Sequence, residues 1–250
     1  MNIKSFALFF LALILLVPAA GCSNGEHPFE ITEAGQLADD SLTPDERILY
    51  LPEVDCLIPY YILSADYNDS TLLLRRDILD VDYPFSREDN GYYAESPIDS
   101  FLNSDFLNLF SEPLLGIIQD TPIDICCKFP DTDHTEQITR KIFLLSASEV
   151  NIHMNIVQDE GKPVDFFKNP ENHLAFRDEQ PAGWWLRSTY IMDRGLAWHI
   201  QPDGTVHGSA VQFPSGVRPA LCIPSSSPVT KNECGNGYIL ADDSNPVTGI

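Results

Sequence analysis

Two histidines and a tryptophan lie in a segment of this sequence that is typical of a β-hairpin. Trp198 and His199 precede a Gln-Pro-Asp-Gly-Thr turn at residues 201–205, and His207 follows it. Proline presets the first turn dihedral and glycine accepts the left-handed position, so the run predicts a tight hairpin with a bulge. A three-residue loop puts His199 opposite His207 with both rings on one face, whereas a two-residue loop turns them to opposite faces.

These side chains could support two kinds of chemistry. Two imidazoles on one face could ligate zinc or copper, but they need one or two further ligands, and no carboxylate or thiol is placed in the sequence to complete the set. We therefore predict no metal and no cofactor. The indole of Trp198 could instead stack on a sugar or a protein surface, so we predict a candidate ligand surface made of Trp198, His199 and His207.

Two arginines in short apolar runs have two possible roles. Arg187 and Arg218 could each hold an anionic ligand in the planar fork of the guanidinium. Alternatively, each is buried in an ion pair or caps loop carbonyls, with Asp99, Asp105 or Glu149 as a possible partner, because a buried arginine without a partner is costly. The sequence leaves both roles open.

The adjacent tryptophans Trp184 and Trp185 begin an extended run. Alternation along a strand directs Trp184 and Leu186 to one face and Trp185 and Arg187 to the other. Both faces must then be covered, so we expect the two indoles to pack in the core rather than to stack on sugars.

The runs Trp-Trp-Leu-Arg-Ser at residues 184–188 and Gly-Val-Arg-Pro-Ala-Leu at 216–221 closely resemble the signature of a widespread bacterial family, the domain of unknown function 6273. Residues 96–103 and 142–146 also resemble that family, so the resemblance covers about Tyr60 to Ile223. The family is similar to the C-type-lectin fold, to sulfatase-modifying proteins and to the variable binding proteins of diversity-generating retroelements. The resemblance implies a binding module, with a sulfatase-modifying type of oxidase as the alternative.

Five cysteines remain besides Cys22, and they are Cys56, Cys126, Cys127, Cys222 and Cys234. Cys222 and Cys234 could form a disulfide in an exported protein. The adjacent pair Cys126 and Cys127 is either a redox or metal element, or one of the two is buried as a small apolar residue. The resemblance to sulfatase-modifying proteins implies cysteines near a substrate groove, but no cysteine here sits in a matching pattern. Since no hydrolase, zinc-protease, phosphate-loop or dinucleotide motif occurs either, we predict no catalytic residues.

The N-terminus has the features of an export signal. Lys4 precedes an apolar run from Phe6 to Val17, which is too short to span a bilayer, and Ala-Ala-Gly-Cys follows. We predict a lipoprotein signal peptide over residues 1–21 and lipidation of Cys22; ordinary secretion with cleavage near Ala20 is the alternative. The protein is then anchored to a cell membrane or the outer envelope and faces away from the cytoplasm.

The chain is strongly acidic, with a formal net charge of −22. Loss of residues 1–21 removes one lysine and no acid, which takes the charge to −23. Such a surface repels phosphate backbones, so nucleic acid is excluded as a partner. Residues 22–47 are acidic with little apolar periodicity, and we expect them to form a flexible tether.

The remaining patterns predict one α+β domain over residues 48–223. We expect a hairpin over 57–76, a helix that begins at the Ser96 cap and ends before Pro113, a surface excursion over 120–141, and a buried strand over 142–145. The capping box of Ser146 and Glu149 predicts a second helix, and residues 158–182 a long loop. Residues 224–250 form a C-terminal tail, with a possible edge strand over 237–241.

The expected architecture is C-type-lectin-like, with two helices packed on a twisted, mainly antiparallel sheet that carries long loops. We predict an exported, membrane-anchored lipoprotein whose non-catalytic domain binds an extracellular glycan or protein. The alternatives are the oxidase or another envelope enzyme, and a structural protein of the envelope that only contacts other proteins.

Overall fold

The computed structural model describes residues 30–88, 90–128, 134–154, 157–190, 193–233 and 235–241. The chain divides into two compact units, residues 1–30 and residues 31–250, and the description below concerns the second. The predicted signal peptide, Cys22 and Cys234 lie outside the described residues. No helix in the described ranges is long and apolar enough to cross a membrane.

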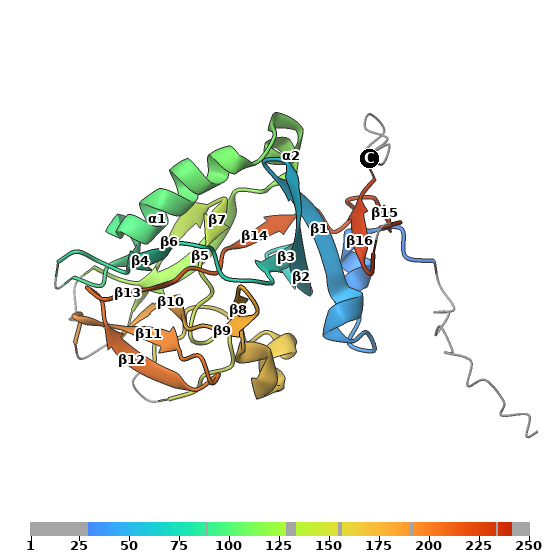
Figure 1. The fold of residues 1–250 in the computed structure, drawn as a ribbon. Coiled ribbons are helices and arrows are strands. Elements are labelled where there is room, and N and C mark those ends of the chain that lie inside the picture. The colour runs from blue at the N-terminus through green and yellow to red at the C-terminus, as the bar shows by residue number, and fades with distance from the viewer. Residues whose placement is uncertain are drawn as a thin grey trace, which may run out of the picture. The chain divides into compact units, whose positions relative to one another are not determined.

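A seven-stranded sheet is the larger of the two main sheets (Figure 1). Its order is β15 (Val229–Lys231), β16 (Tyr238–Leu240), β1 (Ile48–Glu53), β2 (Cys56–Tyr67), β3 (Ser70–Arg75), β14 (Ala220–Ile223) and β7 (Ile142–Phe143). Strands β1 and β16 pair in parallel and the other neighbours pair antiparallel. Asn68 and Asp69 make the left-handed turn between β2 and β3, a conformation that Asn and Asp tolerate. The predicted opening hairpin is therefore confirmed.

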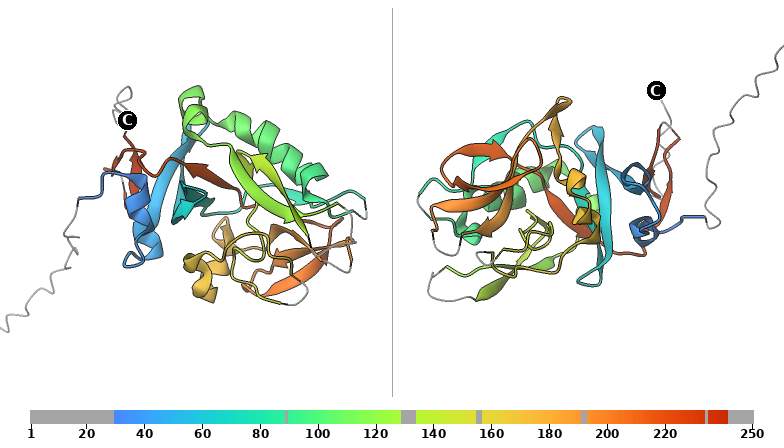
Figure 2. Two further views of the ribbon diagram at one scale, coloured as in Figure 1. Left: turned by 180° about the vertical axis from the view of Figure 1, so that it is seen from behind. Right: turned by 90° about the horizontal axis from the view of Figure 1, so that it is seen from below.

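The second main sheet has five strands and lies at the other end of the described unit from β1 and β2 (Figures 1 and 2). Its order is β12 (Val206–Ala210), β11 (Leu196–Ile200), β10 (Trp184–Thr189), β13 (Pro214–Gly216) and β4 (Asp82–Pro84). Two small hairpins complete the strands, β5 (Thr121–Cys126) with β6 (Thr135–Arg140), and β8 (Phe176–Arg177) with β9 (Gln180–Pro181). The predicted surface excursion over 120–141 is thus largely an ordered hairpin.

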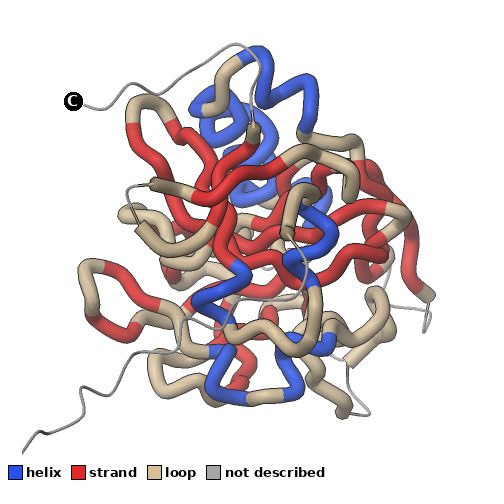
Figure 3. Tube along the Cα trace, turned by 90° about the vertical axis from the view of Figure 1, so that its right-hand side faces the viewer, coloured by secondary structure: helices blue, strands red, loops and turns tan. Residues whose placement is uncertain are grey.

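The helical residues are few beside the strands and loops (Figure 3). Helix α1 (Pro97–Phe101) continues as a π-helical turn, Leu102–Phe106, and a 3-10 turn, Leu107–Leu109, and α2 (Glu112–Ile117) follows. The Ser96 hydroxyl accepts a hydrogen bond from the Asp99 amide at 3.0 Å and so caps α1, as the sequence predicts. Ile98, Leu102 and Phe106 form the buried stripe of this helix.

The predicted second helix at Ser146 is wrong. Both capping-box hydrogen bonds are present, since the Ser146 amide donates to the Glu149 carboxylate at 2.8 Å and the Glu149 amide to the Ser146 hydroxyl at 3.0 Å. The chain nevertheless makes only a turn, because the Glu149 carbonyl accepts from the Val164 amide instead of from a following turn. Asn151 then takes the left-handed conformation, at φ 66°.

The predicted tether over 22–47 is wrong for its second half. Two 3-10 helices, Ala34–Ala38 and Pro44–Arg47, are ordered, and Leu37 is fully buried. The Ala34 amide donates to the Ser227 carbonyl at 2.9 Å. Strands β15 and β16 likewise place two short segments of the predicted C-terminal tail in the sheet (Figure 1). The folded unit therefore extends beyond residues 48–223 at both ends, because these two segments cover each other.

Candidate functional site

The β11–β12 hairpin adopts the first of the two registers that the sequence allows. The Gln201 amide donates to the Thr205 carbonyl at 2.7 Å, and Gly204 takes the left-handed conformation at φ 81°. His199 consequently pairs directly with His207 across the two strands.

Trp198 does not form a contact surface, contrary to the prediction. Its side chain is only 2% exposed because the Tyr190 ring stacks on it, with ring centroids 4.3 Å apart. Gly208 on the neighbouring strand permits this cover, since a Cβ atom there would lie 2.4 Å from the Tyr190 ring. The indole therefore has no free face for a sugar.

His199 is also buried, whereas His207 is exposed. The His199 Nε2 atom is hydrogen-bonded to the Ser215 hydroxyl, and Nδ1 lies 3.0 Å from the Gln201 amide nitrogen. Burial, and to a lesser extent His207, lowers the pKa of His199 to about 4. The ring packs edge-on against Trp185 and is closed off by Gly183, where a Cβ atom would lie 2.5 Å from it. The serine–histidine contact is therefore part of the packing around Trp185.

His199 should make the protein less stable as the pH falls. Its pKa in the folded state, about 4, lies below the ordinary 6.5, so the unfolded chain takes up the proton first. Stability is then lost between pH 6.5 and about 4, by up to about 3 kcal/mol from this group alone. A proton NMR titration of the His199 Cε1–H signal in the folded protein should show a midpoint near pH 4; a midpoint near 6.5 would contradict the burial of the ring.

No group of three or more His, Cys, Asp or Glu side chains within the described part of the chain is arranged to hold a metal ion. His199 and His207 are thus brought together without the further ligands that zinc or copper requires.

Arg187 takes the buried ion-pair role. Its guanidinium and the Glu149 carboxylate form two hydrogen bonds, of 2.6 and 2.8 Å, and both side chains are fully buried. The carbonyls of Asp124, Leu144 and Glu160 accept its other three N–H groups. With all five donors engaged, Arg187 has no capacity left for an anionic ligand.

Arg218 is buried differently. Its Nε donates to the Arg75 carbonyl at 2.9 Å, and the guanidinium lies over the rings of Trp184 and Tyr61, 5.0 and 6.0 Å from their centroids. Its Nη1 has no hydrogen-bond partner among the described residues. Burial lowers the pKa of Arg218 to about 10, which means that the fold carries this charge at a cost. Neither predicted aspartate pairs with it; Asp99 instead forms an ion pair with Arg140.

Trp184 and Trp185 are fully buried. The Trp184 indole donates to the His173 carbonyl at 3.0 Å and the Trp185 indole to the Tyr83 carbonyl at 2.9 Å. Both tryptophans therefore pack in the hydrophobic core, as the alternation along the strand predicts.

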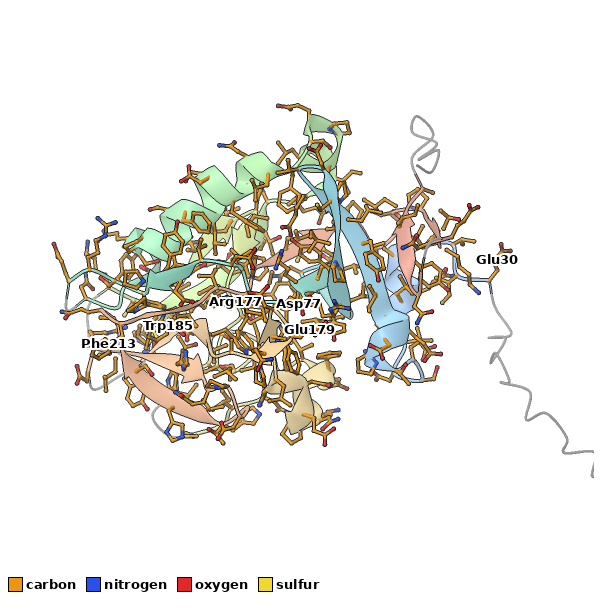
Figure 4. The ribbon with its side chains drawn as sticks, viewed as in Figure 1. Glu30, Asp77, Arg177, Glu179, Trp185 and Phe213 are labelled. Atoms are coloured by element: carbon orange, nitrogen blue, oxygen red, sulfur yellow. The ribbon has the colours of Figure 1, made fainter. Side chains whose placement is uncertain are left out.

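A cavity that the sequence did not reveal lies beside the β8–β9 hairpin. Its volume is about 630 Å³. Its walls come from the second 3-10 helix, from β2, from the end of β3 with the segment that follows it, and from the hairpin with Leu174 before it. The lining residues are Asp45, Tyr61, Arg75, Arg76, Asp77, Ile78, Asp80, Leu174, Phe176, Arg177, Asp178 and Glu179. Figure 4 shows Asp77, Arg177 and Glu179 close together, away from Phe213. A volume of this size accommodates a small ligand or a few residues of a larger one.

Two hydrogen bonds join the segment after β3 to the β8–β9 hairpin. The Ile78 amide donates to the Phe176 carbonyl at 2.9 Å, and the Arg177 Nε donates to the Leu79 carbonyl at 2.8 Å. Asp178 and Glu179 form the turn of the hairpin at φ 48° and 61°. Such turns accept Asp and favour Gly at the second position, so the backbone preference is poor for Glu179. The turn places both carboxylates at the cavity.

The sequence contains the charged residues of the cavity but gives no sign that they meet. The charged triplets Arg75-Arg76-Asp77 and Arg177-Asp178-Glu179 each follow apolar residues. About a hundred residues separate them, and only the fold shows that they meet.

A family model described as "Domain of unknown function (DUF6273)" matches residues 68–225 of the chain. No curated protein and no solved structure matches it.

Proposed function

The chain belongs to this family of unknown function, and on that premise we propose that it is an exported, lipid-anchored module that binds a ligand without catalysing a reaction. The ligand is an extracellular glycan or protein. The binding site is the cavity beside the β8–β9 hairpin rather than the predicted surface of Trp198, His199 and His207.

The cavity is the observation that carries this proposal. Ligand sites are concave and combine apolar walls with a few polar groups. Here the rings of Tyr61 and Phe176 supply apolar surface, and carboxylates and guanidinium groups supply hydrogen-bond partners. The same mixture suits the faces and hydroxyl groups of a sugar and the side chains of a peptide.

Export and anchoring complete the proposal. The apolar run before Ala-Ala-Gly-Cys supports a signal peptide over 1–21 and lipidation of Cys22, and the net charge of −22 supports a partner other than nucleic acid. The two α-helices, the mainly antiparallel sheets and the long loops support the C-type-lectin-like architecture.

Two of the four described cysteines favour binding over oxidase chemistry, whereas Cys56 is exposed and Cys127 half-buried. Burial raises the pKa of both Cys126 and Cys222 to about 12. Their thiols stay protonated at neutral pH, whereas redox and nucleophilic cysteines react as thiolates.

Truncation of Phe176 tests the cavity. A glycan and peptidoglycan-fragment screen on the purified protein identifies a ligand, and Phe176→Ala should then weaken its binding about tenfold through the loss of one ring face. Phe213→Ala is the matched control, because Phe213 is 67% exposed and lies away from the cavity (Figure 4). Isothermal titration calorimetry measures both variants. Equal affinities for Phe176→Ala and the unmodified protein would rule out the cavity as the site.

A further inference from the structure

Glu160 is a buried acid without a cation of its own. The residue is 0% exposed, and no Lys, Arg or His nitrogen of the described residues lies within ion-pair distance of its carboxyl group. The Oε1 atom accepts a hydrogen bond from the Cys126 amide at 2.8 Å, whereas Oε2 has no hydrogen-bond partner in the described part of the chain. A neutral carboxyl group loses less hydration than a carboxylate when it is buried in this way. The surroundings of Glu160 therefore favour its protonated form.

The cation beside Glu160 is Arg187, and its charge is used by Glu149. The Arg187 guanidinium makes two hydrogen bonds to the Glu149 carboxylate, at 2.6 and 2.8 Å, but reaches Glu160 only at the backbone carbonyl, at 2.6 Å. The Tyr67 hydroxyl donates to the same carboxylate of Glu149, at 2.5 Å. One guanidinium thus lies among two buried carboxyl groups and neutralises one of them.

Burial decides the balance between the groups that face Glu160. It raises the pKa of Glu160 above the ordinary value, and Glu149 acts in the same direction. Arg187, the Ser188 hydroxyl and the Cys126 amide act on that pKa in the opposite direction and do not outweigh burial. The Cys126 thiol is itself neutral, because burial and Glu160 raise its pKa to about 12. The charged and titratable groups packed around this site are Cys126 on β5, Arg187 on β10, Glu149 after β7, Tyr67 at the end of β2, and Arg194 before β11, which acts on Cys126.

Glu160 lies in the middle of residues 157–164, which form neither a helix nor a strand. The Glu160 amide donates to the Ser148 hydroxyl at 3.1 Å, and the Val164 amide donates to the Glu149 carbonyl at 2.9 Å. Gly161 packs on the Glu149 side chain, since a Cβ atom there would lie 2.8 Å from Oε1. Few hydrogen bonds therefore hold this segment against the Arg187–Glu149 ion pair, and the buried side chain of Glu160 is one of its main attachments.

We propose that Glu160 makes the docking of residues 157–164 depend on pH: the neutral carboxyl group holds this segment in the core, and its ionisation loosens the segment. The acid holds its proton more tightly in the folded protein than in the unfolded chain. Its contribution to stability is therefore complete below about pH 4.5 and is lost as the pH rises through the folded-state pKa. His199 acts in the opposite sense, because it destabilises the fold in acid.

The same segment forms one wall of a second cavity, of about 420 Å³. Val157, Asp159 and Pro163 line it on this side, and Ile152 and Met154 line it elsewhere. Loosening of residues 157–164 opens that wall, so pH controls access to this cavity. The inference does not depend on the ligand of the cavity beside the β8–β9 hairpin.

Hydrogen exchange of the full chain, resolved by mass spectrometry, tests the inference. The protection factor of the peptide that spans residues 157–164 should fall about tenfold between pH 5 and pH 8, after correction for the pH dependence of exchange itself. Glu160→Gln keeps the shape of the neutral acid but cannot ionise. Its protection factor should be equal at both pH values and, at pH 8, about tenfold higher than that of the unmodified protein.

Asp159→Asn is the matched control. Asp159 is the neighbouring acid of the same segment and is exposed, so its replacement removes the same charge from the surface. This variant should keep the pH dependence of the unmodified protein. A carbon-13 NMR titration of the Glu160 carboxyl group in the unmodified protein is a second measurement that needs no variant, and its midpoint should lie above pH 4.5.

Several results would overturn the inference. They are the same pH dependence of exchange in Glu160→Gln and the unmodified protein, an equal loss of that dependence in Asp159→Asn, and a carboxyl midpoint at or below pH 4.5. Failure of Glu160→Gln to fold would also overturn it, because a neutral side chain of this shape would then not hold the segment. Loss of the proposed function is a separate result, which would appear as ligand binding that Phe176→Ala does not change.

Discussion

Replacement of Arg187 by methionine is expected to lower the free energy of unfolding by about 3–5 kcal/mol, because it leaves the Glu149 carboxylate buried without its counter-ion. The substitution also orphans the carbonyls of Asp124, Leu144 and Glu160, which lie around the guanidinium in the folded protein. The Tyr67 hydroxyl still donates to Glu149, at 2.5 Å, but it supplies no charge. Urea unfolding monitored by tryptophan fluorescence measures the loss.

The same substitution at Arg218 provides the matched control. Arg218→Met removes an equally buried guanidinium that has no carboxylate hydrogen-bonded to it. The buried charge of Arg218 costs folding free energy, and methionine retains much of the packing on Trp184 and Tyr61. We therefore expect Arg218→Met to change the free energy of unfolding by no more than about 1 kcal/mol. Equal destabilisation by Arg187→Met and Arg218→Met would contradict the different roles assigned to the two arginines.

Local patterns in the sequence predict the local structure well. Ser96 and Pro97 mark the start of α1, and the turn at 201–205 limits the hairpin to two registers, of which the structure adopts the one that pairs His199 with His207. The burial of Trp184 and Trp185 follows from the alternation of a strand that is covered on both faces.

Features that depend on contacts between residues far apart in the sequence could not be predicted from it. Ser146 and Glu149 carry the pattern of a helix start, yet the Val164 amide binds the Glu149 carbonyl that a following helical turn would use, and the helix does not form. Leu37 looks isolated in an acidic segment, but it is buried in the hydrophobic core. In both cases a long-range contact overrides the local preference.

The candidate site shows the same limit more strongly. Trp198 beside a turn resembles an exposed ring, and only Tyr190, which stacks on it, shows otherwise. The cavity combines Asp77 with Glu179 and other residues that lie about a hundred positions apart, so no periodicity or spacing could indicate it. Whether Arg187 or Arg218 has a carboxylate partner also depends on Glu149, which lies outside both signature runs of the sequence.

Replacement of Trp185 by alanine is expected to destabilise the protein by about 3–5 kcal/mol, the usual cost of emptying a fully buried tryptophan site. Its indole contacts Phe85 and His199 edge-on, with centroids 5.7 and 5.0 Å away, and donates to the Tyr83 carbonyl next to β13. Trp185→Phe fills most of that space but lacks the N–H group, so its expected cost is about 1–3 kcal/mol. Urea unfolding ranks the two variants, and the NMR signal of the His199 ring should shift in both. A loss below about 1 kcal/mol for Trp185→Ala would mean that the second sheet does not depend on this indole. We expect a larger loss because the space left by the indole can be refilled only by a shift of β4 or β11.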